Sequence, residues 1–220
     1  YWITRFRDWR FPFSRPVGLR YLSLKRFYDL RAERAGYFSP HLRTVIANSD
    51  RVRQALIRRY PHLEPRIRVI YNGADCERFK PENIDRWRKE IRRTCGIPET
   101  DPAAIFAGHN YREKGLRQTI EAIALERQKQ PGKPWHLMVI GRGHPAAYQV
   151  LARRLGLGET AKIVFLGETQ NPERYYAAAD CLILPTFYDP CANVVLEALA
   201  AGLPVITTVQ NGASELLTPG

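Results

Sequence analysis

The sequence has little sulfur and no long apolar run. Its 220 residues include one methionine and four cysteines, and the cysteines show no spacing typical of a metal site or a disulfide framework. No apolar run approaches the roughly 18–20 residues of a membrane-spanning helix, and no signal-peptide pattern opens the chain. These absences argue against the disulfide-scaffold and transmembrane classes and predict a cytoplasmic protein. Because the chain begins at Tyr1 rather than Met, we also expect a segment upstream of it.

Acidic residues are scarce in the first part of the chain. The sequence has 34 Lys or Arg against 22 Asp or Glu, a net charge of +12. Residues 1–95 carry 23 of the basic and 10 of the acidic residues, so the excess lies entirely there. This asymmetry indicates an anionic partner: a membrane surface, a nucleic acid or a phosphorylated substrate. A solvated, Arg-rich surface without a partner is the alternative.

From residue 103 onward, short apolar runs alternate with segments of helical periodicity. Leu116, Ile120 and Ala124, for example, are spaced for one face of a helix. The alternation predicts an α/β domain with a Rossmann-like parallel sheet covered on both faces, and ligands bind at the carboxyl ends of such strands. The predicted strands are 103–107, 136–140, 163–166, 182–184 and 205–207, with helices around 116–124, 150–155, 172–179 and 194–201.

The first 95 residues contain only two predicted strands, too few for a sheet with its own core. We therefore expect residues 1–80 to be the C-terminal part of an incomplete domain and a linker. Residues 81–220 are expected to form a second domain, truncated at its C-terminus. The elements predicted before residue 95 are strands 45–47 and 66–71, helices 22–34 and 84–91, and a helix that begins at the capping residues Asn48, Ser49 and Asp50.

One loop carries two carboxylates ahead of and inside a predicted helix. Asp189 lies in the loop, and Glu197 lies one turn into a helix that begins near Asn193. The backbone N–H groups of Ala192, Asn193 and Val194 would point out of the helix N-terminus, which suits a phosphate. Flanking carboxylates can accept hydrogen bonds from sugar or ribose hydroxyls. Surface and capping roles for the two carboxylates are the alternative.

Two further loops follow predicted strands. Residues 108–115 contain His109, Arg112 and Lys114, and cations at the carboxyl end of a strand can meet a diphosphate. Residues 141–143, Gly-Arg-Gly, form a turn that allows close backbone approach. A solvated basic turn remains the alternative for each.

Taken together, these motifs resemble the retaining GT-B glycosyltransferases of glycosyltransferase family 4. The loop of the carboxylate Asp189, residues 188–193, and the basic loop at residues 109–115 look most like those of bacterial lipopolysaccharide core glucosyltransferases. The resemblance covers about residues 45–217. It is carried by Ile46–Ser49, Ile70–Asp75, Phe79–Pro81, Gly108–Gly115, Val139–Gly141, Phe165–Gly167, Tyr176–Asp180, the carboxylate pair and Ala201–Val205.

The resemblance implies an acceptor-binding first domain and a second domain that binds a nucleotide-sugar donor, UDP-glucose being favoured. It implies that Lys114 neutralises the donor diphosphate, that Glu197 holds the ribose and that Asp189 contacts the transferred sugar. No metal and no other cofactor are implied, because cations and the helix end fill that role. The further donor-binding residues implied are Gly108, His109, Arg112, Gly141, Arg142, Gly143, Glu168, Thr169, Cys191, Ala192, Asn193 and Val194.

The sequence departs from the family pattern at two positions. Asp189 stands where the family usually has Glu, so its reach to the sugar is one methylene shorter. His109 stands where a basic residue is usual, and Arg112 is the alternative source of that charge.

Other functions compete with glycosyl transfer. A basic, aromatic N-terminal segment favours a membrane-surface binding module, and an enzyme at the cytoplasmic face of a bacterial inner membrane, with a glycolipid or glycan acceptor, would combine both functions. A sugar-nucleotide epimerase or a phosphorylase shares the architecture, whereas no motif supports nucleic-acid binding. Residues 1–220 alone are expected to bind nucleotide weakly and to transfer no sugar. The segment contains Trp2, Arg5, Phe6, Arg7, Trp9, Arg10, Phe11 and Phe13.

Overall fold

The computed structural model describes residues 24–130, 132, 134–158 and 161–217. These residues form two compact units. The first comprises residues up to 46 together with 55–68, and the second comprises 47–54 and everything from 69 onward. The division predicted from the sequence, at residue 80, stays a prediction. The aromatic and basic segment that ends at Phe13 lies outside the described residues.

The first unit is built mainly of helices around a buried tyrosine. The Tyr60 hydroxyl donates to Glu33 Oε1 at 3.0 Å, and the Tyr60 ring lies 4.9 Å from that of Tyr37. Ser49 accepts the N–H of Val52 and so caps the helix that begins at Asp50, as predicted. The short helix η3 was not predicted. The elements up to residue 69 are α1 (Leu24–Tyr37), β1 (Val45–Ala47), α2 (Asp50–Arg59), η3 (Pro61–Arg66) and β2 (Ile67–Val69), with β1 paired to β2.

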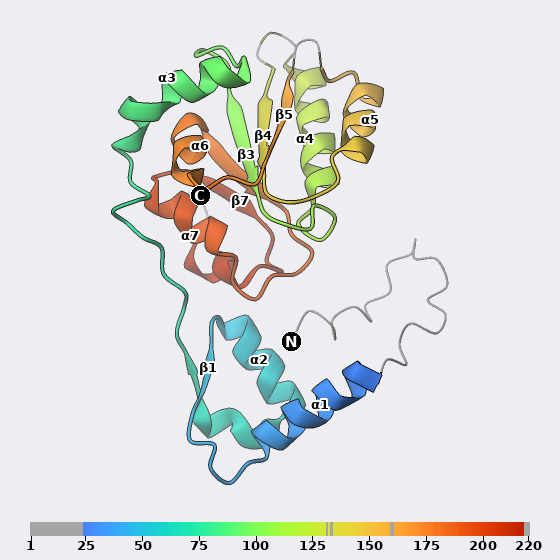
Figure 1. Cartoon of the computed structure of the whole chain (residues 1–220), viewed down its shortest axis with the longest axis vertical. Helices are drawn as coiled ribbons and strands as arrows, with labels where there is room; N and C mark the ends of the chain where they lie inside the picture. The colour runs from blue at the N-terminus through green and yellow to red at the C-terminus, as the bar shows by residue number, and fades with distance from the viewer. Residues whose placement is uncertain (1–23, 131, 133, 159–160, 218–220) are drawn as a thin grey trace. The chain divides into compact units, whose positions relative to one another are not determined.

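The second unit is a five-stranded sheet in the order β5-β4-β3-β6-β7, and every recorded pairing is parallel. All five predicted strands are present, so the predicted α/β class with a parallel sheet is confirmed. Figure 1 shows α4 and α5 on one face of the sheet and α3, α6 and α7 on the other. The elements are α3 (Asn83–Cys95), β3 (Ala103–Ala107), α4 (Leu116–Lys129), β4 (His136–Ile140), α5 (Ala146–Arg154), β5 (Ile163–Gly167), α6 (Pro172–Ala178), β6 (Cys181–Leu184), α7 (Asn193–Ala200), β7 (Val205–Thr207) and η4 (Gly212–Leu216).

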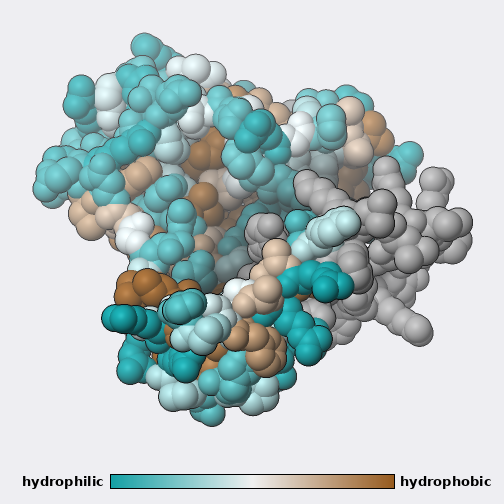
Figure 2. Space-filling model, turned by 60° about the horizontal axis from the view of Figure 1, so that its bottom comes forward, coloured by the Kyte–Doolittle hydropathy of each residue, from teal (hydrophilic) through white to brown (hydrophobic). Residues whose placement is uncertain are grey.

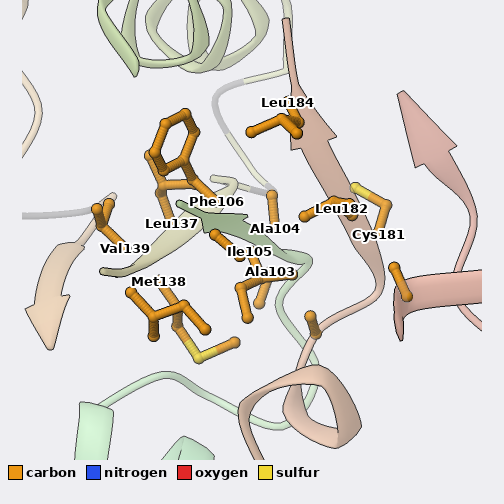
Figure 3. Packing of buried hydrophobic residues seen from close by; sticks show 14 of the residues in the cluster. Ala103, Ala104, Ile105, Phe106, Leu137, Met138, Val139, Cys181, Leu182 and Leu184 are labelled. Carbon is orange, nitrogen blue, oxygen red and sulfur yellow. The ribbon is translucent and has the colours of Figure 1, made fainter. Parts of the chain in front are cut away.

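The core of this unit lies on β3 and its two neighbours. Every residue of β3 and β4 is buried, as expected for central strands of a parallel sheet covered on both faces. Phe106 and Leu137 lie in the cluster of apolar side chains shown in Figure 3, with Leu182 and Leu184 from β6. This packing fixes the strands, and therefore the positions at which the following loops begin.

The surface is mainly hydrophilic on the face that Figure 2 shows, with small hydrophobic patches between the polar residues. None of the helices in the described ranges has the length and apolar character needed to cross a membrane. All four cysteines carry free thiols, and only Cys76 is exposed.

Candidate active site

The loops after β3 and β6 lie side by side where the strand order reverses. From β3 the chain proceeds outward through β4 and β5 and then returns to β6 on the other side. Ligands of open α/β sheets bind outside the carboxyl ends of strands at such a switch point. The two most informative loops of the sequence, 108–115 and 185–192, therefore meet at the place where a ligand is expected.

A salt bridge joins these two loops. The Lys114 ammonium pairs with Oδ2 of Asp189, and the other carboxylate oxygen accepts the Cys191 N–H at 3.1 Å. The Asp189 side chain is 10% exposed and that of Lys114 is 24% exposed. The Lys114 side chain is therefore only partly buried by the contact with Asp189. The structure thus brings together two of the three residues to which the sequence assigned chemistry.

Backbone contacts hold the loops at this separation. The Glu113 carbonyl accepts the Phe187 N–H at 2.9 Å and the Thr186 hydroxyl at 3.1 Å. Gly115 has φ +82°, and a Cβ there would lie 2.2 Å from the Pro185 carbonyl oxygen. Only glycine allows this approach. The position of Lys114 beside the second loop is therefore built into the backbone.

The Gly-Arg-Gly turn packs against the start of the first loop. Gly141 has φ +116°, and a Cβ there would lie 2.1 Å from the Gly108 carbonyl oxygen. Tyr111 donates its hydroxyl to the Gly141 carbonyl at 2.7 Å, and a Cβ at Gly143 would lie 2.4 Å from its ring. The three glycines to which the resemblance gave donor contacts thus also serve close packing between the loops.

His109 and Arg142 belong to an exposed polar cluster on the rim. His109 Nδ1 accepts the Arg142 N–H at 2.9 Å, and Arg142 Nε lies 3.2 Å from Glu168 Oε1. The nearby Thr169 hydroxyl accepts the Asn171 N–H at 3.1 Å. The charge of Arg142 is therefore already partnered by a carboxylate.

Arg112 is directed toward a different neighbour. It is exposed, and its positive charge acts on Tyr148 of α5, where burial nevertheless raises the tyrosine pKa. Among the described residues, no ion pair connects Arg112 to Asp189 or to another carboxylate. Lys114 is thus the cation that the structure pairs with the Asp189 loop.

Glu197 lies in α7 and receives a hydrogen bond from a buried tyrosine. The Tyr176 hydroxyl donates to Glu197 Oε2 at 3.0 Å. Burial raises the pKa of Glu197 above its ordinary value, whereas this hydrogen bond and the positive charge of Arg78 lower it. Burial and the adjacent carboxylate raise the pKa of Tyr176 well above its usual range, so the phenol keeps its proton and donates.

The N-terminus of α7 offers two free donors, whereas the sequence predicted three and the resemblance added the N–H of Cys191. The Cys191 N–H donates to Asp189, and the Ala192 N–H donates to Asn211 Oδ1 at 3.1 Å. Asn193 and Val194 begin the helix, and their N–H groups have no acceptor within the described part of the chain. An anion at this end of α7 would therefore meet those two groups.

Three contributors were not identified as site residues from the sequence. Asn211 is fully buried, and its side-chain oxygen accepts the N–H groups of both Ala192 and Ala213. Asn72 donates to Asn193 Oδ1 at 2.7 Å, although the sequence indicated no role for it beyond its place in the Ile70–Asp75 segment. Tyr176 was noted as part of a motif without a role. The sequence of α6 gives no sign of which polar atom on α7 the Tyr176 hydroxyl meets.

The described residues contain no group of three or more His, Cys, Asp or Glu side chains that could hold a metal ion. The absence of a metal requirement remains a prediction.

The family is decided by the match over the second unit. Residues 101–220, more than half of the chain, match the family model "Glycosyl transferases group 1". The chain belongs to this glycosyltransferase family. Residues 8–78 match a second model, "Glycosyltransferase Family 4". The family resemblance read from the sequence is confirmed.

Individual relatives of this group 1 glycosyltransferase are about twice its length. It is 30% identical over 190 residues to D-inositol 3-phosphate glycosyltransferase of Corynebacterium jeikeium, covering 80% of this chain and 45% of the relative. It is 31% identical over 150 residues to the lipopolysaccharide glucosyltransferase WaaG of Escherichia coli, covering 67% and 38%. The chain thus spans about half the length, or less, of the curated relatives it matches.

Solved structures agree on the fold. The crystal structure of WaaG, a glycosyltransferase involved in lipopolysaccharide biosynthesis, superposes with a TM-score of 0.76 at 26% identity, covering 90% of this chain and 53% of that one. Anabaena Alr3699/HepE in complex with UDP and glucose gives a TM-score of 0.69 at 24% identity, covering 87% and 50%. The predicted GT-B fold class is confirmed.

Proposed function

We propose that this group 1 glycosyltransferase binds a nucleoside diphosphate sugar at the loops after β3 and β6. The whole protein would then transfer the hexose to a glycolipid or glycan acceptor with retention of anomeric configuration. The observation that carries the proposal is the Lys114–Asp189 pair at the switch point of the sheet, beside the N-terminus of α7. UDP-glucose as donor and lipopolysaccharide core as acceptor are favoured by the names of the similar proteins.

The donor would be held at three places. The diphosphate would lie between the Lys114 ammonium and the free N–H groups of Asn193 and Val194, which combine positive charge with unsatisfied donors. Asp189 would accept hydrogen bonds from hydroxyls of the hexose. Glu197 would accept hydrogen bonds from the ribose, because only one of its oxygens receives the Tyr176 hydroxyl.

The rim residues would border the base and the phosphates. Glu168 and Thr169 follow β5 and would lie along the nucleobase. The glycine turn at 141–143 would let the backbone approach the donor closely, with His109 beside it.

The reaction would break the bond between the anomeric carbon and the donor phosphate oxygen, which keeps the electron pair. The acceptor hydroxyl oxygen would bond to the anomeric carbon on the same face, and its proton would pass to the departing phosphate. The developing phosphate charge would be stabilised by Lys114 and by the α7 N-terminus, groups already in place before the reaction. For this reason we propose no metal requirement.

The first unit supports a role at an anionic surface. Residues 28–46 and 55–68 of this unit hold seven Arg and three Asp or Glu. Such a surface attracts anionic lipid headgroups, as at the cytoplasmic face of an inner membrane. Sedimentation with vesicles of neutral or anionic lipid, across a salt series, tests this part: binding should require anionic lipid and weaken with salt, and lipid-independent behaviour would refute it.

Transfer itself is tested with a donor labelled in the hexose. In the whole protein, Lys114→Ala should lower the rate of label transfer to the acceptor by at least about 10²-fold, the scale of losing one electrostatic stabiliser. The exposed Lys129 of α4 supplies the matched control, Lys129→Ala. Label that changes configuration within the nucleotide sugar would instead indicate an epimerase, and normal transfer by Lys114→Ala would reject the assignment.

A further inference from the structure

Tyr176 is a fully buried residue whose only polar side-chain atom points at the candidate ribose carboxylate. Its hydroxyl lies 3.0 Å from Glu197 Oε2 and 3.4 Å from the Val194 carbonyl oxygen. Both contacts are to α7, whereas Tyr176 itself belongs to α6. A buried phenol that reaches a carboxylate on a neighbouring helix restricts the rotation of that carboxylate, because turning it would leave the hydroxyl with only its longer contact to the Val194 carbonyl.

The tyrosine ring is itself held by a second aromatic ring. Phe79 is buried and packs edge-on against the Tyr176 ring, with the ring centres 5.7 Å apart. Arg78 lies over the Phe79 ring and forms an ion pair with Glu173 at 2.8 Å. Since Glu173 belongs to the same helix as Tyr176, residues 78 and 79 hold both the helix and the ring.

One carboxylate oxygen is thereby committed to the protein and the other is left available. Glu197 Oε1 has no hydrogen bond to any described residue. A carboxylate held by one oxygen presents the second in a defined direction, and the two lone pairs of that oxygen can accept hydrogen bonds from two vicinal hydroxyls.

We propose that Tyr176 is the positioning residue for the Glu197 carboxylate, directing it toward the vicinal hydroxyls of the donor ribose. The inference rests on the proposed function, since it assigns Glu197 to that ribose. Tyr176 would not touch the nucleotide. It would act by fixing the orientation of Glu197 and by keeping its carboxyl group ionised.

The test compares the affinity for UDP with the affinity for 2′,3′-dideoxyuridine diphosphate, which lacks both ribose hydroxyls. Calorimetry measures both affinities in the unmodified chain and in Tyr176→Phe, a variant that keeps the ring and its packing. The unmodified chain should bind UDP at least about tenfold more tightly than the dideoxy compound. In Tyr176→Phe the ratio of the affinities for UDP and for the dideoxy compound should fall to about threefold or less. The affinity for inorganic pyrophosphate should stay within about twofold of that of the unmodified chain. The neighbouring Tyr175→Phe is the matched control and should keep the affinity ratio, because the Tyr175 hydroxyl forms no hydrogen bond with any residue that the structure describes.

The pH dependence of UDP affinity is a second measurement, and a purely structural role of Tyr176 would not change it. Without the donated hydrogen bond the Glu197 pKa should rise, so the loss of UDP affinity on acidification should begin at a higher pH. If Tyr176→Phe fails to fold, Phe79→Leu loosens the same ring and should lower the ratio partially.

The possible results separate the two claims. An unmodified chain that binds no UDP would overturn the proposed function, and this inference with it. A chain that prefers UDP over the dideoxy compound, and keeps that preference and the same pH profile in Tyr176→Phe, would overturn the inference alone.

Discussion

The Lys114 ammonium forms an ion pair with the Asp189 carboxylate, joining the loop after β3 to the loop after β6. The pair lies at the point where the strand order of the sheet reverses, and hydrogen bonds from the second loop to the Glu113 carbonyl hold it there. Contacts within the protein thus fix the position of the positive group proposed to meet the donor diphosphate.

Lys114→Met should weaken UDP binding by roughly 10- to 100-fold, because a charge-assisted hydrogen bond contributes about 1.5–3 kcal/mol. Methionine keeps most of the apolar stem and removes only the charge. Calorimetric titration with UDP measures the effect. Lys129→Met, at an exposed position of α4, should leave the affinity unchanged. Equal affinities in the two variants would show that Lys114 does not contact the nucleotide.

Asp189→Asn should lower the free energy of unfolding by about 1 kcal/mol. The amide can still accept the Cys191 N–H, so the change removes mainly the attraction to Lys114, which is partly screened by solvent. A double-mutant cycle isolates this attraction: urea unfolding is measured for Asp189→Asn, for Lys114→Met and for the variant that carries both changes. The expected coupling is about 0.5–2 kcal/mol, and a value indistinguishable from zero would mean that the pair does not hold the loops together.

Glu197→Gln should weaken UDP binding without destabilising the fold near neutral pH. Burial raises the pKa of Glu197, so the folded chain binds this proton more tightly than the unfolded chain. Between the unfolded and folded pKa values the folded state therefore carries more protons, and its stability falls as pH rises. The glutamine cannot ionise, so this part of the pH dependence should disappear.

Thermal unfolding of Glu197→Gln between pH 4 and pH 8 checks this expectation, with Glu90→Gln at an exposed position of α3 as a control. A variant clearly less stable than the unmodified chain at pH 7 would show that the ionised carboxylate stabilises the fold, contrary to the direction given by burial.

Gly141→Ala should cost at least about 2 kcal/mol of stability, because φ +116° strains an alanine and its Cβ would collide with the Gly108 carbonyl oxygen. Gly132→Ala is the control in the same unit, since a Cβ there meets nothing within 4 Å. Denaturant unfolding compares the two. Similar stabilities would mean that the glycine turn is not in close contact with the first loop.

The fold was more predictable than the site. All five strands of the sheet could be predicted because each is a short apolar run that ends in glycine or a polar turn, a local signal. Lys114 and Asp189 could be chosen for the same reason: both follow such strands. Contacts between residues far apart in the chain could not be predicted, because no local sequence pattern indicates them. The N–H of Ala192 is bonded to Asn211, and Glu197 is held by Tyr176, so the number of free donors and the orientation of Glu197 depended on packing.

The central claim is that a nucleoside diphosphate binds at Lys114, and the melting temperature of the chain with UDP, compared with uridine, tests it most directly. At 100 times its dissociation constant, UDP should add about 2.7 kcal/mol to the stability of the unit that binds it. For a unit of this size the melting temperature should then rise by roughly 5 °C or more, while uridine should give little change and Lys114→Met should lose most of the rise. No rise with UDP at millimolar concentration, or the same rise in Lys114→Met, would contradict the account.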